Sequence, residues 1–300
     1  MNWLLIALTA HFLFALVFIV DKFILSKTVL QPTVYAFYVG LLGITALALF
    51  PFGFDLLPIN QILISFLAGF LFVLAILFFY QAIKLGEISR VVPIVGGAVP
   101  LFTLFFSYSL LDERLSWDQF IAFFLLIIGS VVMFWPRREK ILAKASLNKR
   151  LFFSLLAAFF FASSYVLSKF IYLEQSFING FIWIRLGGFL GAWLLLFWPN
   201  VRQAVFKTSK KIKFKVGGLA AANKSISAFS HLLLNYAIAL GSVTLVNALQ
   251  GVQYAFLLII ALFLSKKFPQ IIKEQISNGV IMRKVMAICL ISLGLVILAF

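Results

Sequence analysis

Ten long apolar segments, separated by short polar loops, constrain the fold of this chain more than any motif. They lie near residues 2–21, 33–52, 60–82, 88–111, 116–135, 150–171, 177–198, 214–240, 242–265 and 283–300. An apolar stretch of about 20 residues crosses the hydrocarbon core of a bilayer as a helix. The sequence therefore predicts an all-α membrane protein with ten transmembrane helices.

Positive charge is distributed unevenly among the predicted loops. The loops after the first, third, fifth, seventh and ninth segments together carry +17, whereas the other loops carry −4. Cytoplasmic loops of membrane proteins are enriched in Lys and Arg. This distribution predicts a multi-pass protein of the cell (cytoplasmic) membrane with both termini outside the cytoplasm. Orientation thus accounts for the net charge of +16, and nucleic acid is not an expected partner.

The ten segments form two sets of five. Four markers recur in the same order: residues 20–24 and 167–171, Gly40 and Gly187, residues 80–86 and 235–241, and Gly129 and Gly294. An odd number of crossings per set places the second set upside down, which is the inverted-repeat architecture of alternating-access carriers. We therefore predict a first five-helix repeat over 1–135, a basic linker over 136–149 and a second five-helix repeat over 150–300.

Several of these markers resemble the drug/metabolite transporter superfamily, in particular its ten-helix EamA type. They are the Ala-Ile-x-Leu-Gly endings at 82–86 and 237–241, the segment from Pro93 to Pro100, the acidic turn at 112–116, and Gly129 and Gly294. The resemblance implies a basket of helices whose central cavity is lined by the first, third, fourth, sixth, eighth and ninth segments. Members of this family are often drawn with cytoplasmic termini, whereas the loop charges here predict the opposite.

Lys224 is the foremost candidate for a substrate-binding or coupling residue. It follows Lys215 by nine residues, about 13 Å along a helix, so its ammonium is expected inside the membrane. Ionisable groups at membrane depth usually face the bundle interior or a water-filled cavity. His231 and Asn235 share its helical face. The alternative is a structural hydrogen-bond network that holds this helix to its neighbours.

Other polar residues within the apolar segments are further candidates for substrate binding or coupling, or for helix packing. They are His11, Tyr80, Gln81, Ser164, Asn247, Gln250 and Tyr254, with Ser163, Tyr165 and Gln253 beside them. A neutral imidazole such as His11 titrates in the physiological range. Hydroxyl and amide side chains bind polar solutes, but they also bond neighbouring helices in membranes.

The fourth segment contains two prolines and two glycines, at Pro93, Gly96, Gly97 and Pro100. Proline removes a backbone donor and clashes with the preceding turn, and glycine weakens a helix further. We predict a broken helix that acts as a hinge, with a static kink as the alternative. In the seventh segment, Arg185 is predicted to form a structural ion pair with Glu174.

The residues that are missing also constrain the mechanism. No Asp or Glu falls in the middle of any predicted segment, so coupling would use His11, His231, Lys224, a sodium site or substrate exchange. A cationic site favours an anionic or zwitterionic solute over a cation. Neither a nucleotide-binding loop nor metal-ligand spacing is present in the sequence, so no cofactor is expected.

These observations predict a secondary transporter, a permease or exporter of a small polar metabolite such as an amino acid, and no enzyme. The alternatives are a flippase for a lipid-linked anionic headgroup, a membrane-embedded lipid transferase and a non-transporting assembly protein. A transferase would need clustered carboxylates, and only Asp112, Glu113 and Asp118 gather anywhere. The expected partners are a small-molecule substrate and membrane lipid, with a homodimer left open.

Overall fold

The computed structural model describes residues 2–25, 32–85, 88–133, 144–209, 214–267 and 278–299. In these ranges the secondary structure is helical, and every one of the ten predicted apolar segments lies on helix. Eight helical segments are long and apolar enough to cross a membrane. The chain is therefore a multi-pass membrane protein of the all-α class.

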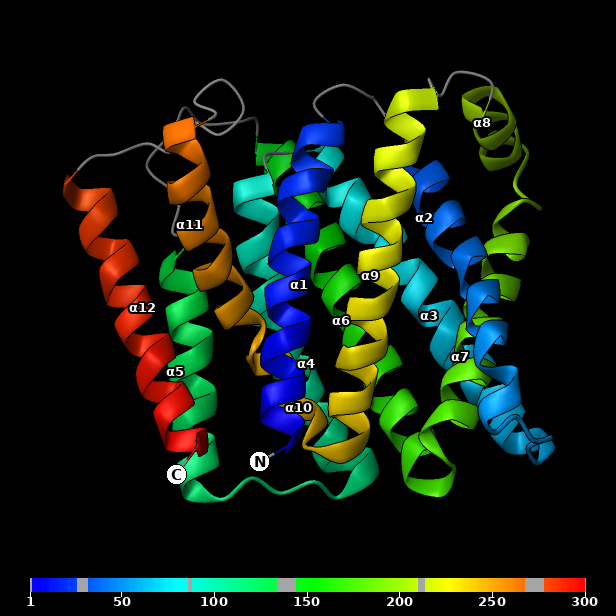
Figure 1. The fold of residues 1–300 in the computed structure, drawn as a ribbon, viewed down its shortest axis with the longest axis horizontal. Coiled ribbons are helices and arrows are strands. Elements are labelled where there is room, and N and C mark those ends of the chain that lie inside the picture. Colours follow the sequence, from blue (N-terminus) through cyan, green and yellow to red (C-terminus); the bar gives the residue numbers. More distant parts are fainter. Residues whose placement is uncertain are drawn as a thin grey trace. The chain divides into compact units, whose positions relative to one another are not determined.

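The helices follow one another along the chain with short connections (Figure 1). They are α1 (Asn2–Leu25), α2 (Pro32–Leu41), the 3₁₀-helix η1 (Leu42–Phe52), α3 (Ile59–Lys84), α4 (Ile88–Leu111), α5 (Trp117–Met133), α6 (Lys144–Glu174), α7 (Phe177–Leu195), α8 (Pro199–Ser209), α9 (Phe214–Leu240), α10 (Val243–Ala248), α11 (Gln250–Lys267) and α12 (Asn278–Ala299). The eight candidate crossings leave out α9, which carries Lys224, His231 and Asn235, and the shorter α5.

The helices gather into two compact units that do not follow the sequence halves. Unit 1 comprises residues 1–29, 114–137 and 213–300, and unit 2 comprises residues 30–113 and 138–212. Each unit therefore combines helices from both predicted sequence halves. The predicted division into repeats over 1–135 and 150–300 concerns sequence equivalence, and it stays a prediction.

In unit 1, α1 packs against α9 and α11, and α5 packs against α12 and α11. The contact between α5 and α12 is close because each helix presents a glycine to the other. A Cβ at Gly129 would lie 2.7 Å from Ile291 Cγ1, and a Cβ at Gly294 would lie 3.1 Å from the Ala122 carbonyl oxygen. The two marker glycines of the sequence thus serve one helix–helix interface.

In unit 2, α3 packs against α6, α7 and α2, while α4 packs against α6. The residues between α4 and α6 form an apolar core that includes Val91, Val95 and Val99 from one side and Ala157 and Ala158 from the other. The short helix α8 lies against α2. The sequence analysis placed a loop over α8, because its eleven residues are too few and too polar to form a crossing.

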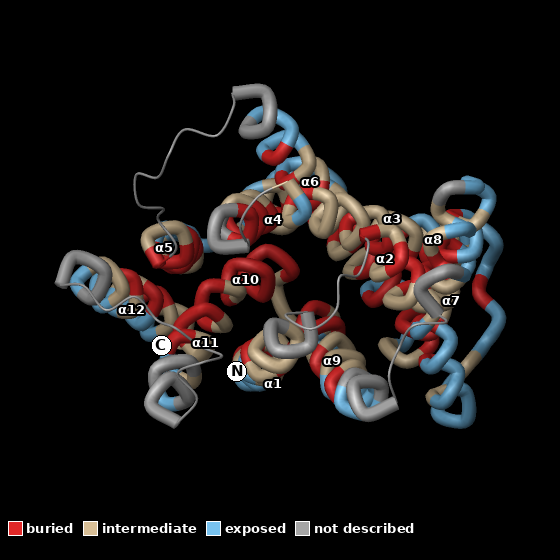
Figure 2. Tube along the Cα trace, turned by 90° about the horizontal axis from the view of Figure 1, so that it is seen from above, coloured by how far each residue is buried: buried red, intermediate tan, exposed pale blue. Residues whose placement is uncertain are grey.

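The predicted break in the fourth segment is wrong at the level of secondary structure. Helix α4 is continuous from Ile88 to Leu111, through both prolines. The interruption lies instead in the ninth segment, where α10 ends and α11 begins on either side of Leu249. All six residues of α10 are buried, as its red colour in Figure 2 shows.

The α10–α11 break is located where the chain passes close to α5. A Cβ on Gly251 would clash with the Ser130 hydroxyl and would lie 3.0 Å from the Leu126 carbonyl oxygen. Glycine therefore permits a close backbone approach that another residue would prevent. The interruption follows from tertiary packing in unit 1, which the sequence of the segment alone does not reveal.

Candidate functional site

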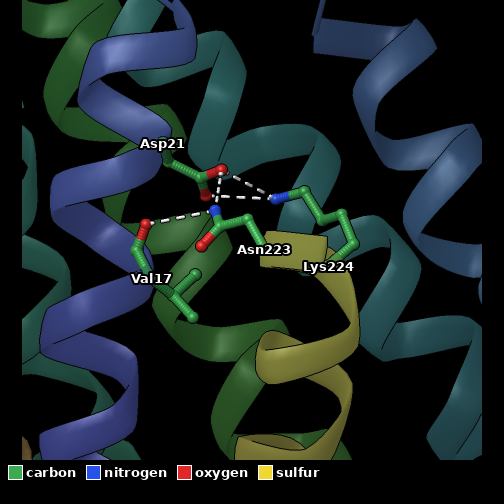
Figure 3. Close-up of polar contacts among 4 residues, drawn as sticks. All are labelled: Val17, Asp21, Asn223 and Lys224. Atoms are coloured by element: carbon green, nitrogen blue, oxygen red, sulfur yellow. Dashed lines mark hydrogen bonds and ion pairs between the residues drawn. The ribbon is translucent and has the colours of Figure 1, made fainter. Parts of the chain in front are cut away.

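The strongest polar site of unit 1 joins α1 to α9 through Asp21, Asn223 and Lys224 (Figure 3). The Lys224 ammonium donates to both carboxylate oxygens of Asp21, each at 3.1 Å. The Asn223 amide donates to Asp21 Oδ1 at 2.9 Å and to the Val17 carbonyl oxygen at 3.3 Å. We call these three side chains the α1–α9 polar network.

The network is largely shielded from solvent. The side chains of Lys224 and Asp21 are 23% and 18% exposed, and Asn223 is buried. A shielded ion pair is favourable only when its charges are close together and further hydrogen-bonded. The loss of either partner leaves the other charge poorly solvated. The Lys224 ammonium is thus directed at α1.

Asp21 changes two sequence-based interpretations. The sequence analysis assigned it to the first loop, but α1 continues to Leu25 and carries Asp21 near its end. Lys224 therefore lies level with the end of the apolar stretch Asn2–Asp21, nearer the membrane edge than its distance from Lys215 indicated. The carboxylate also neutralises Lys224, so this lysine does not by itself favour an anionic solute.

His11 lies near the middle of α1 and is buried, as a central polar candidate requires. Its Nδ1 lies 3.4 Å from Gln253 Oε1 on α11, and its Nε2 lies 3.3 Å from the Val246 carbonyl oxygen of α10. One imidazole therefore bridges the two helices that flank the break at Leu249. The sequence analysis named His11 and Gln253 separately, and the structure brings them together.

His231 and Asn235 occupy the face of α9 that the sequence predicted. The His231 ring packs edge-on against Phe14 of α1, with ring centroids 4.8 Å apart. The Asn235 amide donates to the His231 carbonyl oxygen at 2.8 Å, one turn back along the same helix. Asp21 and Phe14 of α1 thus both contact polar residues of α9.

The candidates on α10 and α11 are mainly buried within unit 1. The Asn247 amide donates to the Val243 carbonyl oxygen at 2.8 Å, and the Tyr254 side chain is buried. Gln250 is the first residue of α11 and is half-buried. Their role in binding a solute stays a prediction.

Three candidates lie in unit 2 and are therefore described separately. Tyr80 stacks on Tyr35 of α2 at 4.1 Å between ring centroids, and Gln81 follows it on α3. The Ser164 hydroxyl donates to the Ala68 carbonyl oxygen of α3 at 2.8 Å. Ser164 thus bonds α6 to α3, as a packing residue would.

The four hinge candidates belong to α4. Gly96, Gly97 and Pro100 are buried there, and Pro93 lies within the same uninterrupted helix. A proline inside a helix still removes one backbone donor, so a bend at this position is compatible with continuous helix. Hinge motion in α4 stays a prediction.

Arg185 does not form the ion pair that the sequence predicted. Its guanidinium lies over the rings of Phe72 and Phe181, at 5.5 Å and 5.9 Å from their centroids. Glu174 is exposed at the end of α6, and among the described residues no ion pair joins it to Arg185. The sequence analysis placed Arg185 near the membrane edge, but it is the ninth of the 19 residues of α7.

The comparison with protein families agrees with the motifs seen in the sequence. Residues 1–135 match the EamA-like transporter family. The match covers somewhat less than half of the chain, so it shows a similarity of the N-terminal part of the chain to this family of transporters.

The fold is also found in solved structures. A crystal structure of another protein aligns with 99% of this chain and 96% of its own chain, at a TM-score of 0.68 and 16% sequence identity. At that identity the similarity concerns the fold alone. The comparison with curated protein sequences gives no match.

Proposed function

We propose that this protein is a secondary transporter that moves a small polar metabolite by alternating access. The transporter class comes from the family match over residues 1–135. The observation that carries the finer proposal is the α1–α9 polar network, in which a partly buried Asp–Lys pair joins α1 to α9 at the end of the apolar stretch Asn2–Asp21. Ionisable residues within membrane helices mark solute and ion pathways more often than packing sites.

Asp21 is an acidic residue at the end of the first apolar segment, where it is paired with Lys224. A carboxylate held by one ammonium and one amide can exchange its partners for a proton, a sodium ion or the amine of a solute. We therefore assign coupling to Asp21 and Lys224, together with His11 at the centre of α1. The proposed solute is an amino acid or a related metabolite, and the proposed location is the cell membrane with both termini outside.

The proposed architecture is ten helices in two inverted five-helix repeats. The helix contacts support it, because α1 packs on α9 and α11 in unit 1 just as α6 packs on α3 and α4 in unit 2. These helices are the first, eighth and ninth predicted segments, and the sixth, third and fourth. Each member of one triad is the predicted repeat partner of a member of the other.

The α10–α11 break supports a moving element in the ninth segment. Interrupted helices inside membrane proteins are tolerated where neighbours or a cavity meet the freed backbone groups, and they often mark transport sites. His11 bonds to both sides of this break. We propose that rearrangement at Leu249 accompanies exchange of the solute.

The test is uptake by proteoliposomes that contain the purified protein. A thermal-shift screen against amino acids, sugars, phosphorylated metabolites and organic cations first identifies the solute, because a ligand at a hundred times its Kd stabilises the folded state by about 2.7 kcal/mol. Asp21→Asn and Lys224→Ala should then abolish uptake while both proteins still insert and purify. Arg202→Gln, on the exposed face of α8, is the matched loss of charge and should leave uptake unchanged.

Normal uptake by both network variants would contradict the assignment of coupling to the network. No uptake of any solute by the unmodified protein would contradict the transporter proposal itself. A reporter fused after Phe300 tests the orientation, since the proposal requires it to be active outside the cytoplasm. Cytoplasmic reporter activity would reverse the predicted topology.

A further inference from the structure

Arg185 is a membrane-depth cation in unit 2 that the proposed transport mechanism does not use. It is the ninth residue of the 19-residue helix α7, about 12 Å from one end and about 15 Å from the other. An arginine side chain cannot cover either distance by extending along the helix. The guanidinium is therefore held at depth, where a charge is costly unless it has a function or a partner.

The contacts of the guanidinium are aromatic. Phe72 of α3 and Phe181 of α7 lie beneath it, and both rings are buried. Tyr165 and Tyr172 of α6 are close enough to interact with it electrostatically. These tyrosines are seven residues apart and so share one face of α6. The guanidinium thus lies over two phenylalanine rings and near two tyrosines, and we call these residues together with Arg185 the Arg185 site.

The described part of the chain provides no carboxylate for the Arg185 site. Arg185 forms no ion pair there, and Glu174 is exposed at the end of α6. A ring stabilises a cation but does not accept the five in-plane N–H donors of a guanidinium.

The geometry of arginine indicates what would satisfy those donors. A guanidinium is a flat fork that matches a carboxylate or phosphate through two parallel hydrogen bonds. Arg185 is half-buried whereas Phe72 and Phe181 are buried, so the fork is more accessible than the rings beneath it. Two tyrosine hydroxyls on the neighbouring helix are further donors for the oxygens of such an anion.

We propose that the Arg185 site binds the anionic group, a carboxylate or a phosphate, of the solute that this protein transports. This inference rests on the proposed transport function and adds the charge of the substrate to it. It also replaces Lys224 as the source of positive charge, since Lys224 is neutralised by Asp21. The site forms within unit 2 from α3, α6 and α7 alone.

The experiment measures binding to the purified protein by thermal shift and calorimetry. The probes are glutamate, succinate and inorganic phosphate, with tetraethylammonium as a cation of similar size. One or more of the anions should bind the unmodified protein, and Arg185→Gln should weaken that binding at least tenfold. Arg185→Lys should weaken it less, since it keeps the charge and loses the fork, and Arg202→Gln should bind as the unmodified protein does.

Two further arms separate other sources of an anion and failure to fold. Nanodiscs with and without phosphatidylglycerol distinguish a lipid headgroup from a free solute, and an effect confined to the lipid overturns the proposal. Modification of Arg185 by phenylglyoxal in the unmodified protein, read by mass spectrometry, needs no variant. Protection by the bound anion supports the site, and unchanged modification overturns it.

The outcomes also distinguish this inference from the transport proposal. Uptake of a neutral or cationic solute that persists in Arg185→Gln would overturn the Arg185 site and leave the transporter intact. Equal anion affinity in Arg185→Gln and the unmodified protein would do the same. Absence of any uptake by the unmodified protein contradicts transport, while the binding measurements still decide what Arg185 does.

Discussion

Two helix interfaces, α1–α9 in unit 1 and α6–α3 in unit 2, occupy equivalent positions in the proposed repeat but differ in chemistry. The sequence offsets of 147 between the first and sixth segments and 155 between the third and eighth relate Val17 to Ser164 and Asn223 to Ala68. Val17 contacts Asn223 in unit 1, and their counterparts Ser164 and Ala68 contact each other in unit 2. Asn223 donates to the Val17 carbonyl oxygen, and Ser164 donates to the Ala68 carbonyl oxygen.

The same offsets relate the ion pair of unit 1 to small residues in unit 2. Asp21 corresponds to Ser168 and Lys224 to Gly69. Ser168 is buried and donates to the Ser164 carbonyl oxygen of its own helix at 2.7 Å, while Gly69 is pressed against the backbone of α7. Unit 2 thus has a serine that bonds within α6 and a glycine that faces α7 at the positions where the α1–α9 interface holds two charges.

This difference in chemistry indicates that the two interfaces have different functions. Close packing of small residues holds membrane helices together without any polar group that a solute could reach. A nearly buried ion pair contributes little net stability, because desolvation offsets its attraction. We infer that α6–α3 is a structural contact and that α1–α9 carries the chemistry of transport.

The largest expected effect comes from removal of one charge of the ion pair. Asp21→Ala leaves Lys224 without its carboxylate and should lower the free energy of unfolding by about 3 kcal/mol. Urea unfolding of the protein in bicelles would measure the change. The exchanged double variant, Asp21→Lys with Lys224→Asp, should recover most of it. A change below about 0.5 kcal/mol in the single variant would mean that solvent stabilises the charges and that the network is not shielded.

A smaller effect is expected from a methyl group at Gly69, where α3 packs closely against α7. The added Cβ of Gly69→Ala would meet the Ile184 carbonyl oxygen and the Gly187 carbonyl carbon, which are backbone atoms that cannot rotate away. Overpacking of this kind costs about 1–3 kcal/mol. Gly218→Ala is the matched control, because nothing lies within 4 Å of its Cβ, and it should be neutral or stabilising. Equal stability of the two variants would show that the interface is loose.

Length and apolarity were sufficient to predict where the helices lie, because a membrane crossing sets both quantities. Ser116 and Gln119, three residues apart, have the spacing of a capping box, and its two reciprocal hydrogen bonds are present at 3.1 Å and 3.3 Å. The position of the helix break was not predictable in this way. Proline and glycine pointed to α4, whereas the contact of Gly251 with α5 determines the break and involves residues far apart in sequence.

The candidate site was only half visible in the sequence. Lys224, His231 and His11 were identified because polar residues are rare in apolar helices. Asp21 was assigned to a loop, although the apolar residues 23–25 after it indicate that the helix continues. Asp21 and Lys224 are 203 positions apart in the sequence, so no local sequence pattern indicates that they are in contact. Arg185 was identified, but its predicted ion pair with Glu174 was wrong. That prediction relied on the short distance between the two residues along the chain.

The smallest expected effect compares the two equivalent hydrogen bonds directly. Ser164→Ala removes one bond between α6 and α3 and should cost about 0.6 kcal/mol, the average for such bonds in membranes. Asn223→Ala removes the corresponding bond to Val17 and also the bond to Asp21. It should cost more, about 1–2 kcal/mol, and should slow uptake, which Ser164→Ala should not. Ser163→Ala is the control for serine loss, because the Ser163 hydroxyl bonds only within α6, to Phe159 at 2.8 Å. Equal losses of stability and unchanged uptake in both variants would make the two interfaces alike in function as well as in position, and would remove the argument that places transport on α1 and α9.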